Sequence, residues 1–416
     1  MVKITKLINK GIFAGPMDTF QQVIGRLPPL ESLLCEHEGL PHPFIPASDS
    51  YFQEQFYWDS FFIMQGLKHL GTKGQAVMKG MVENFFAMLE EYGYIPNSYI
   101  THDTRTQPPF LSSMVRMVHA ASGNGVDSEW LEMAYGKIVQ EYMDVWTTGK
   151  RLTSTGLSRY HDDNDPHNKG GDPSYGAMQE SGWDNTLRFG GSVSSNGRYV
   201  ERSRVPVCNP VDLNSLLYKY EADLAVLADD LGRRPEAARW RGVAAKRKEI
   251  ITKYLWDEEQ GFFFDYDPEA DKALTTLSLA GYYPLWAGLA TEEQAKLMVE
   301  KLPVFEYDGG LSATEKKLSG PNIQWGYPNG WAPLHWLVVN GLRGYGFDQD
   351  ADRITKKWLT TCADAVVRSG QWAEKLCVDP HAIRVDDARY EHQANLYWTM
   401  GVFLDLCQIM EDIIIA

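Results

Sequence analysis

Apolar residues recur at helical spacing along most of this 416-residue chain, and this periodicity limits its fold more than any other feature. In residues 213–231, leucines and a tyrosine return every three or four positions, and Gly232 is placed to end that helix. The best strand signal, at 261–266, predicts one arm of a β-hairpin. Similar helical patterns cover 17–25, 59–71, 74–92, 110–122, 127–147, 234–255, 274–289, 291–302, 331–344, 347–369 and 392–414. We therefore predict an all-α fold of about twelve helices.

Three long stretches, 41–58, 149–210 and 303–330, have no helical period. Loops of this length are usually functional or disordered, and the aromatic residues here argue against disorder. No break in composition divides the chain, so residues 1–416 are expected to form one domain, with 149–210 as an active-site loop or cap. We predict a double ring of inner and outer helices whose loops build a pocket at one end. A helical-repeat solenoid and two packed bundles are the alternatives; the solenoid is disfavoured because the informative residues lie in irregular loops.

The charge balance of the chain argues against one class of partner. Lys and Arg number 40 against 55 Asp and Glu, and a net charge of −15 does not suit nucleic acid, whose phosphates need a basic surface. Aromatic residues make up 12% of the chain and include 13 Trp. Such a content is typical of proteins that grip sugars, but it is equally compatible with a large core.

Other global features concern the cell compartment. The first ten residues lack the apolar stretch of a signal peptide, and no run of about 18 apolar residues predicts a transmembrane helix. The five cysteines are scattered without a CxxC pair, which indicates reduced thiols rather than a disulfide framework or a zinc site. We therefore expect a cytoplasmic protein that does not contact a membrane, and the oligomeric state stays open.

Two segments carry aromatic and polar side chains suited to a sugar. In 52–62, Trp58 can serve as a platform for a sugar ring and Asp59 as an acceptor for hydroxyls, although Asp59 or Ser60 can equally cap a helix. The second segment, 93–109, is a loop whose polar side chains can bind hydroxyls or simply face solvent. Its candidate residues are Asn97, Arg105 and Gln107.

Two further segments each place a carboxyl group beside a tryptophan. Asp184 follows Trp183, and an apolar wall of this kind raises the pKa of a general acid. Glu374 lies two residues after Trp372 and can be the second carboxyl group that glycoside hydrolysis needs. The alternatives are a capped turn for Asp184 and a surface Glu–Lys pair for Glu374. Because the chain has 55 acidic residues, spacing alone does not select this pair.

The segment 322–333 alternates aromatic with amide side chains and then forms a Pro-Asn-Gly turn that opens an apolar helix. In chain order the motifs are FxExFYWDS, IPN…RxQPP, ESGWD, PVDLNSLLY, QWxYPNGWAP, EK and QxxxxWT. This ordered set resembles the trehalases, the α,α-trehalose hydrolases of glycoside hydrolase family 37, from about residue 45 to 402. The resemblance implies an (α/α)6 barrel and an inverting mechanism, with Asp184 as general acid and Glu374 as general base. Inversion requires carboxyl groups about 6.5–9.5 Å apart.

The same resemblance suggests which residues bind the substrate. Several of them match sugar-contacting positions of trehalases, and others lie beside the motifs. The expected substrate-binding residues are Tyr51, Phe52, Trp58, Asp59, Asn97, Tyr99, Arg105, Gln107, Trp183, Gln324, Trp325, Arg389 and Trp398. No metal and no organic cofactor is expected, because two carboxyl groups and water suffice for the reaction.

The chain also departs from the trehalase pattern at several pocket positions. Gly326 replaces the Asp of Gln-Trp-Asp, Tyr51 replaces an Arg, and Arg389 replaces a Glu. In the segment around Pro173, an Arg and a Glu of the trehalase pattern are missing. An acidic leaving group would pair with Arg389, Arg202 or Arg204; the alternative is that these are ordinary surface charges. This pattern is similar to the mannosylglycerate and glucosylglycerate hydrolases of family 63.

The sequence therefore predicts an inverting α-glycoside hydrolase acting on a small compatible-solute α-glycoside. Mannosylglycerate or glucosylglycerate is the first expectation and α,α-trehalose the alternative. A family 63 oligosaccharide α-glucosidase is a second alternative, and a sugar-binding or scaffold protein without activity is the rival from another class.

Overall fold

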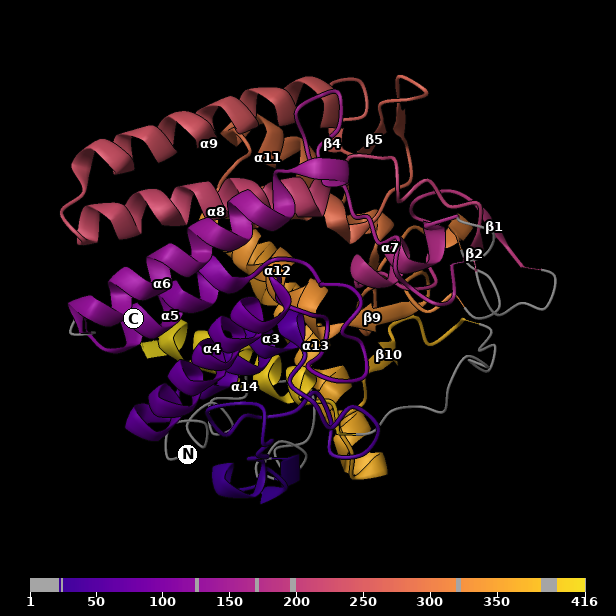
Figure 1. The fold of residues 1–416 in the computed structure, drawn as a ribbon. Coiled ribbons are helices and arrows are strands. Elements are labelled where there is room, and N and C mark those ends of the chain that lie inside the picture. Colours follow the sequence, from indigo (N-terminus) through magenta and orange to yellow (C-terminus); the bar gives the residue numbers. More distant parts are fainter. Residues whose placement is uncertain are drawn as a thin grey trace.

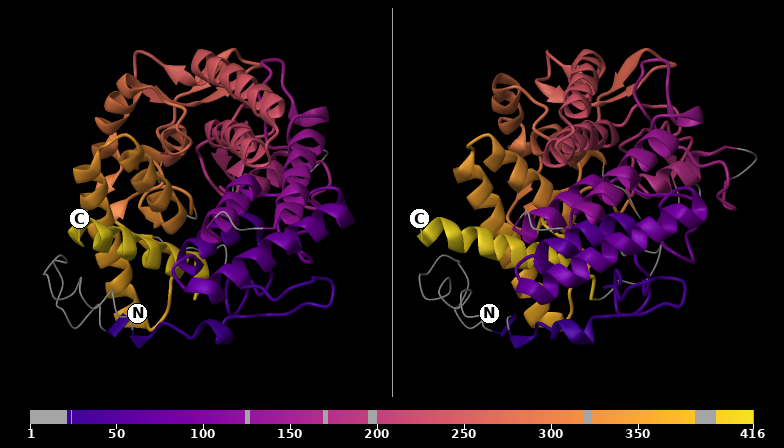
Figure 2. Two further views of the ribbon diagram at one scale, coloured as in Figure 1. Left: turned by 90° about the vertical axis from the view of Figure 1, so that its left-hand side faces the viewer. Right: turned by 60° about the vertical axis from the view of Figure 1, so that its left-hand side comes forward.

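Six helices form a closed inner ring in the computed structural model, which describes residues 22–23, 25–123, 127–168, 172–194, 200–318, 323–382 and 395–415. Each inner helix packs against the next one in the chain, and the last packs back against the first. Viewed from the left-hand side of Figure 1, the helices follow one another around this ring in chain order (Figure 2, left). The inner helices are α3 (Tyr57–Leu67), α5 (Leu111–Ala121), α8 (Val211–Asp230), α10 (Tyr283–Trp286), α12 (Ala332–Gly344) and α14 (Tyr397–Ile415).

Outer helices alternate with the inner ones along the described parts of the chain. They are α4 (Gly71–Tyr92), α6 (Ser128–Glu141), α9 (Arg234–Leu255), α11 (Glu292–Val299) and α13 (Asp348–Ser369). Every residue of α3 is buried, because an inner helix has neighbours on all sides, whereas α13 buries only one stripe. The predicted (α/α)6 double ring is therefore confirmed.

Within the described residues, five two-stranded antiparallel ladders connect or brace the helices. The signal at 261–266 is confirmed, and it contributes to two adjacent hairpins rather than one. The pairs are β1 (Ser192–Val193) with β2 (Val200–Glu201), β3 (Trp256–Asp257) with β4 (Phe262–Phe263), β5 (Asp265–Asp267) with β6 (Lys272–Leu274), β7 (Glu306–Tyr307) with β8 (Gly310–Leu311), and β9 (Asn329–Trp331) with β10 (Lys375–Cys377).

Three predicted element boundaries differ from the structure. The helix predicted at 274–289 is shorter, because Lys272–Leu274 pairs with β5 and the helical turns begin only at Leu279. The predicted loop 149–210 contains a short helix, α7 (Ser174–Glu180), which is too short to show a period in the sequence. The helix predicted at 127–147 changes after Glu141 into a π-helical turn, Tyr142–Trp146. The helix predicted at 17–25 falls largely outside the described residues.

The helix α7 and the strands β1, β2, β9 and β10 lie at one end of the helices, on the right in Figure 1. Segments from the middle and the last quarter of the chain are thus brought to one end of the ring. Among the helices that the structure describes, none is long and apolar enough to cross a membrane. That residues 1–416 form a single catalytic domain stays a prediction.

Candidate active site

Three carboxyl groups from distant parts of the described chain form the centre of the candidate site. Asp59 lies in the first turn of α3, Asp184 follows α7, and Glu374 immediately precedes β10. Burial above all, together with the charges of Glu374 and Asp184, raises the pKa of Asp59 to about 8, against a backbone hydrogen bond that lowers it. At neutral pH the Asp59 carboxyl therefore keeps its proton, which makes it a hydrogen-bond donor as well as an acceptor.

The loop 97–107 holds the start of α3, where the first backbone N–H groups have no partner within the helix. The N–H of Trp58 donates to Oε1 of Gln107 at 3.0 Å. The N–H of Tyr57 donates to the carbonyl of Asn97 at 3.1 Å, and the N–H of Asn97 donates to the carbonyl of Arg105 at 2.7 Å. Asn97 and Gln107 thus hold the first turn of α3, which carries Trp58 and Asp59. This role was not assigned to them from the sequence.

Arg105 is a buried cation with a buried partner. Its Nη1 donates to Oδ2 of Asp165 at 2.7 Å, and the arginine is only 9% exposed. Its Nε atom is buried and has no hydrogen-bond partner in the described part of the chain. The guanidinium is therefore fixed on one side while one donor is left for a further acceptor.

Two donors from the segment 324–325 orient the carboxyl group of Asp184. Nε2 of Gln324 donates to Oδ2 at 2.5 Å, and Nε1 of Trp325 donates to Oδ1 at 3.1 Å. The loop before Asp184 needs glycine at position 182, because φ is +70° and an added Cβ would lie 2.8 Å from the indole of Trp58. The close approach at Gly182 brings the Asp184 loop directly against α3.

The short ladder of β9 and β10 carries Glu374 to the same place. Lys375 lies opposite Trp331 in this ladder. Nζ of Lys375 donates to Oε2 of Glu374 at 3.2 Å, and the Glu374 side chain is 7% exposed. From the other side, the Thr399 hydroxyl on α14 donates to the carbonyl of Ala373 at 2.8 Å. The sequence left a surface pair open for Glu374 and Lys375, whereas the structure buries both.

Indole rings form a cluster beside the carboxyl groups, and one of them, Trp325, donates to Asp184. The ring of Trp325 stacks on Trp331, with centroids 3.8 Å apart and planes 5° apart. Between ring centroids, Trp58 lies 5.5 Å from Trp325 and 5.8 Å from Trp398, and Trp183 lies 5.3 Å from Trp325. Nε1 of Trp183 and Nε1 of Trp398 are buried without a hydrogen-bond partner among the described residues. Such a wall suits a sugar ring, whose apolar faces pack on aromatic rings while its hydroxyls take hydrogen bonds.

Sequence reasoning missed Trp331 and Lys375 as members of this site. Trp331 lies in the segment 322–333, and Lys375 lies in 371–375, the segment that also holds Trp372 and Glu374. Neither spacing nor residue type indicates that the two segments pair as strands. The available signal was a tryptophan on each side of the Pro-Asn-Gly turn, Trp325 before it and Trp331 after it, because a turn brings the residues on its two sides close together.

Two other expected substrate-binding residues lie in different surroundings. Tyr51 is 69% exposed, and its ring meets Phe52 edge to face at 4.9 Å. The hydroxyl of Tyr99 donates to Glu91 at 3.2 Å, and its ring lies 5.1 Å from that of His37. These contacts do not test a role in substrate binding, which stays a prediction for both tyrosines.

The arginines proposed to meet an acidic leaving group are placed as follows. Nε of Arg204 donates to Asp267 at 2.7 Å, and its Nη2 donates to Glu269 at 2.8 Å, so two carboxylates already neutralise it. Arg202 is exposed and has a left-handed backbone, with φ at +57°. Arg389 lies outside the described residues.

Gly326 has a packing reason that the sequence does not reveal. A Cβ atom at this position would lie 2.7 Å from Cγ2 of Ile323 and 3.2 Å from the carbonyl oxygen of Leu318. Any larger residue would displace these neighbours, so the local packing by itself accounts for glycine here.

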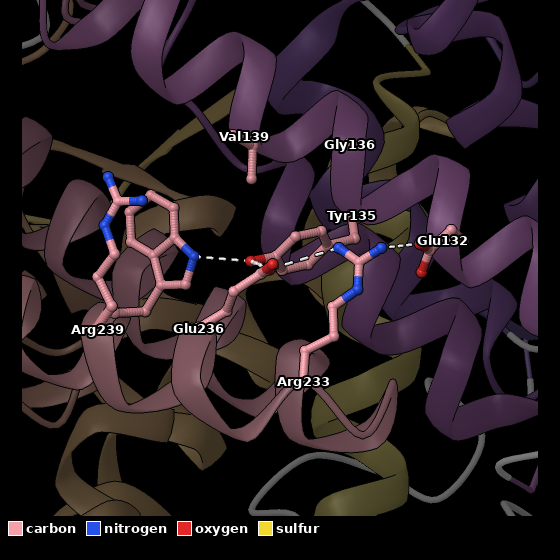
Figure 3. Close-up of a pocket in the computed structure, with 8 residues that line it drawn as sticks. Glu132, Tyr135, Gly136, Val139, Arg233, Glu236 and Arg239 are labelled. Carbon is pink, nitrogen blue, oxygen red and sulfur yellow. Dashed lines mark hydrogen bonds and ion pairs between the residues drawn. The ribbon is translucent and has the colours of Figure 1, made fainter.

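A pocket on the outside of the ring, of about 400 Å³, lies between α6 and α9 (Figure 3). Three of its charged side chains are paired, because Arg233 contacts both Glu132 and Glu236, and the guanidinium of Arg239 lies 5.9 Å from the ring centre of Trp240. Trp240 donates to the Tyr135 hydroxyl at 2.8 Å, and that hydroxyl donates to Glu236 at 2.9 Å. None of the three carboxyl groups of the candidate site lines this pocket. Among the described residues, no group of three or more His, Cys, Asp or Glu is placed to hold a metal ion.

Curated trehalases are similar to this chain over most of its length. The cytosolic neutral trehalase of Saccharomyces cerevisiae is 35% identical over 401 residues, which cover 82% of this chain and 52% of the relative. The periplasmic trehalase of Xanthomonas campestris pv. campestris is 32% identical and covers 89% of this chain and 68% of that relative. The chain spans about half the length of several curated relatives it matches. Because cytosolic and periplasmic relatives both match, the cytoplasmic location stays a prediction.

Solved structures agree with the observed fold. Neutral trehalase Nth1 from Saccharomyces cerevisiae superposes with a TM-score of 0.75 at 31% identity, covering 88% of this chain and 73% of that one. The family 63 mannosylglycerate hydrolase from Thermus thermophilus, solved with Tris and D-glycerate, gives a TM-score of 0.66 at 19% identity and covers 94% of this chain and all of its own. The second likeness concerns the fold alone.

A family model provides the most direct assignment. The model described as trehalase matches residues 20–177 and 172–411, and so covers nearly all of the chain, including all three carboxyl groups of the site. The resemblance carried by the ordered motifs is confirmed, and the chain belongs to the trehalase family.

Proposed function

We propose that this protein is an inverting glycoside hydrolase that cleaves α,α-trehalose into two molecules of glucose. The observation that carries the proposal is the cluster of Asp59, Asp184 and Glu374 inside a wall of indole rings, in a chain of the trehalase family. Two carboxyl groups acting from opposite faces of a sugar are the machinery that glycoside hydrolysis needs.

The roles of the carboxyl groups follow from their partners. Asp184 acts as the general acid and protonates the glycosidic oxygen; the donors from Gln324 and Trp325 fix the plane of its carboxyl group, so that the proton is presented in one direction. Glu374 acts as the general base, because the ammonium of Lys375 at 3.2 Å favours its carboxylate form. It removes a proton from a water molecule that attacks the anomeric carbon from the opposite face.

Trehalose is preferred over an α-glycoside of glycerate, the first expectation from the sequence. Relatives named as trehalases are up to 35% identical, whereas the mannosylglycerate hydrolase is similar in fold at 19% identity. Two features that favoured an acidic leaving group are accounted for within the protein itself, because packing requires Gly326 and Arg204 is paired with Asp267 and Glu269. Neither the named relatives nor the surroundings of Gly326 and Arg204 support an oligosaccharide α-glucosidase.

The substrate and the stereochemistry can be tested in one experiment. Proton NMR is recorded while the protein is incubated separately with trehalose, mannosylglycerate and glucosylglycerate. We expect cleavage of trehalose, with one glucose released first as the β-anomer and the other as the α-anomer, because inversion affects only the attacked ring. Cleavage of a glycerate glycoside alone would reject trehalose as the substrate, and two α-anomers as first products would reject inversion.

The two catalytic assignments are tested by near-isosteric substitutions. Asp184→Asn and Glu374→Gln should each lower kcat by at least about 100-fold, because each removes a proton-transfer group from the transition state. Glu249→Gln, an exposed change on α9, is the matched control and should leave kcat unchanged. Thermal unfolding is measured for all three proteins.

A sugar-binding protein without activity gives a different pattern. The wild type would then hydrolyse none of the three glycosides, while one of them would still raise its unfolding midpoint. Near-normal turnover in either Asp184→Asn or Glu374→Gln would reject the assigned mechanism.

A further inference from the structure

An unbroken chain of hydrogen bonds joins the two catalytic carboxyl groups through two other side chains. Nζ of Lys375 donates to Oε2 of Glu374 at 3.2 Å and to Oε1 of Gln324 at 3.1 Å. Nε2 of Gln324 then donates to Oδ2 of Asp184 at 2.5 Å. We call Gln324 and Lys375 together the carboxylate bridge.

The direction of the carboxylate bridge is determined by chemistry. A lysine ammonium has three donors and no acceptor, so the oxygen end of the Gln324 amide must face Lys375. The nitrogen end of the same amide must then face Asp184. No other orientation of the amide satisfies both partners, and the bridge therefore always presents a donor to each carboxyl group.

The surrounding fold holds both members of the bridge in place. The indole of Trp331 and the side-chain amide of Asn329 donate to the main-chain carbonyl of Gln324, at 3.0 and 3.1 Å. Lys375 is opposite Trp331 in the β9–β10 ladder, and its ammonium lies 5.4 Å from the centre of that ring. A side chain that is 3% exposed keeps its charge only if nearby groups replace water, and here Glu374, Gln324 and the ring face do so.

We propose that Gln324 and Lys375 are positioning residues that join the two catalytic carboxyl groups into one unit, Lys375 keeping Glu374 as a carboxylate and Gln324 orienting Asp184. The inference rests on the proposed function, because the roles of acid and base belong to that reaction. Among the described titratable groups, Asp59 from α3, His102 from the loop 97–107 and Lys375 from β10 act on these carboxyl groups.

The lysine is tested by Lys375→Met. We expect kcat for trehalose to fall about 100-fold, since small misplacements of reacting groups cost that much, while KM changes little. The acidic limb of the pH profile of kcat/KM should move to higher pH, because Glu374 loses its cation and is protonated more readily. Lys375→Arg, which keeps the charge, should restore the position of this limb. An unmoved limb in Lys375→Met would overturn the role of Lys375.

The glutamine is tested by Gln324→Glu. This change keeps an acceptor for Lys375 but places a negative charge beside Asp184, which will therefore hold its proton to higher pH. The basic limb of the same profile should move to higher pH. In addition, the double variant Lys375→Met, Gln324→Met should lower kcat about as much as the more harmful of the two single changes. Each change already interrupts the same chain of hydrogen bonds between Glu374 and Asp184. Additive losses, or an unmoved basic limb, would overturn the bridge.

A final measurement is independent of turnover and separates the two proposals. Lys375→Met is introduced into the wild type and, separately, into the Glu374→Gln variant. The unfolding midpoint should fall more in the wild type, because only there does the substitution leave a buried carboxylate, that of Glu374, without its cation. Equal decreases would overturn the bridge. If no glycoside is hydrolysed but the decreases differ, the proposed function fails and the bridge stands. Lys246→Met, an exposed change that contacts only Glu249 among charged partners in the described chain, is the control and should alter neither kcat nor the midpoint.

Discussion

At the scale of single residues, His335 shows how the fold determines a protonation state. It is fully buried on α12, stacks on Trp358 at 3.8 Å, accepts the Leu311 N–H at Nε2 and donates from Nδ1 to the carbonyl of Trp331. Burial lowers the pKa of His335 to about 3, against a backbone hydrogen bond that raises it. The histidine is therefore neutral in the folded protein at any ordinary pH.

This lowered pKa predicts a loss of stability in acid. The unfolded chain binds a proton at His335 below about pH 6.5, whereas the folded protein does so only near pH 3, so stability falls as the pH decreases through this range. At pH 5 the loss attributable to His335 should be about 2 kcal/mol relative to pH 7.5. Unfolding midpoints at the two pH values should differ less for His335→Gln than for the wild type. His167→Gln, at an exposed histidine, should leave the difference unchanged, and an unchanged difference in His335→Gln would contradict the prediction.

Some residues can be interpreted from their type alone, whereas others can be understood only from the packing around them. Trp58, Asp59, Asp184, Glu374 and Trp325 were named from motifs, and the structure brings them together. The meaning of Gly326 was different. In the sequence it looked like the loss of a substrate contact, whereas its Cβ space is occupied by Ile323, a neighbour whose position depends on a turn.

At the scale of elements, a buried arginine ties the Asp184 loop to the barrel. The guanidinium of Arg188 donates to both oxygens of Asp212 on α8, at 2.8 and 2.9 Å, and to both oxygens of Asp265 on β5, at 2.6 and 2.8 Å. It also lies 4.8 Å from the ring centre of Trp183, the residue before Asp184. Three elements that carry or support the site therefore meet at one fully buried cation.

This connection predicts a large effect of Arg188→Met. Two carboxyl groups would remain buried without their cation, and breaking a buried ion pair in this way costs about 3–5 kcal/mol of unfolding free energy. Thermal unfolding at one scan rate should show a markedly lower midpoint, and Asp212→Asn with Asp265→Asn on the same background should restore part of it. Arg353→Met is the control, because that arginine is 44% exposed and its ion pairs with Glu306 and Asp350 should contribute less than about 1 kcal/mol. Similar midpoints for the two methionine variants would contradict this account.

The β9–β10 ladder marks the limit of element prediction. The sequence indicated the turn at 328–330 and the motif at 371–375, but two helices separate Gly330 from Trp372. The short pairing carries no alternation that a sequence pattern can detect. It depends on where α12 and α13 return the chain, and it is this pairing that buries Glu374 and Lys375.

At the scale of the whole molecule, the ring closes where α14 packs on α3. Two glycines allow the helices to touch: a Cβ at Gly66 would lie 2.9 Å from the Cα of Gly401, and a Cβ at Gly401 would lie 2.5 Å from the carbonyl oxygen of Phe62. Trp58 and Asp59 are on one of these helices and Trp398 is on the other. The closure of the ring therefore also sets the distance between two walls of the candidate site.

Gly401→Ala should accordingly reduce both stability and turnover. A methyl group that meets backbone cannot be absorbed by a side-chain movement, and overpacking of this kind costs about 1–3 kcal/mol. The unfolding midpoint should fall, and kcat for trehalose should fall with it as Trp398 moves relative to Trp58. Gly242→Ala on α9, where no atom lies within 4 Å of the added Cβ, should instead be neutral or stabilising by up to about 1 kcal/mol. A neutral Gly401→Ala would show that the helices separate without cost.

The sequence by itself determined the helical class, the approximate bounds of most helices, the two catalytic candidates and the family, because these depend on local periodicity and on motifs whose order is preserved along the chain. The tertiary structure alone decided how these parts act on one another. It placed Lys375 and Gln324 between Asp184 and Glu374, gave Asp59 a proton at neutral pH, and paired Arg204 with carboxylates. Burial, charge and hydrogen bonding between residues far apart in the chain depend on distances in space, which no local pattern specifies.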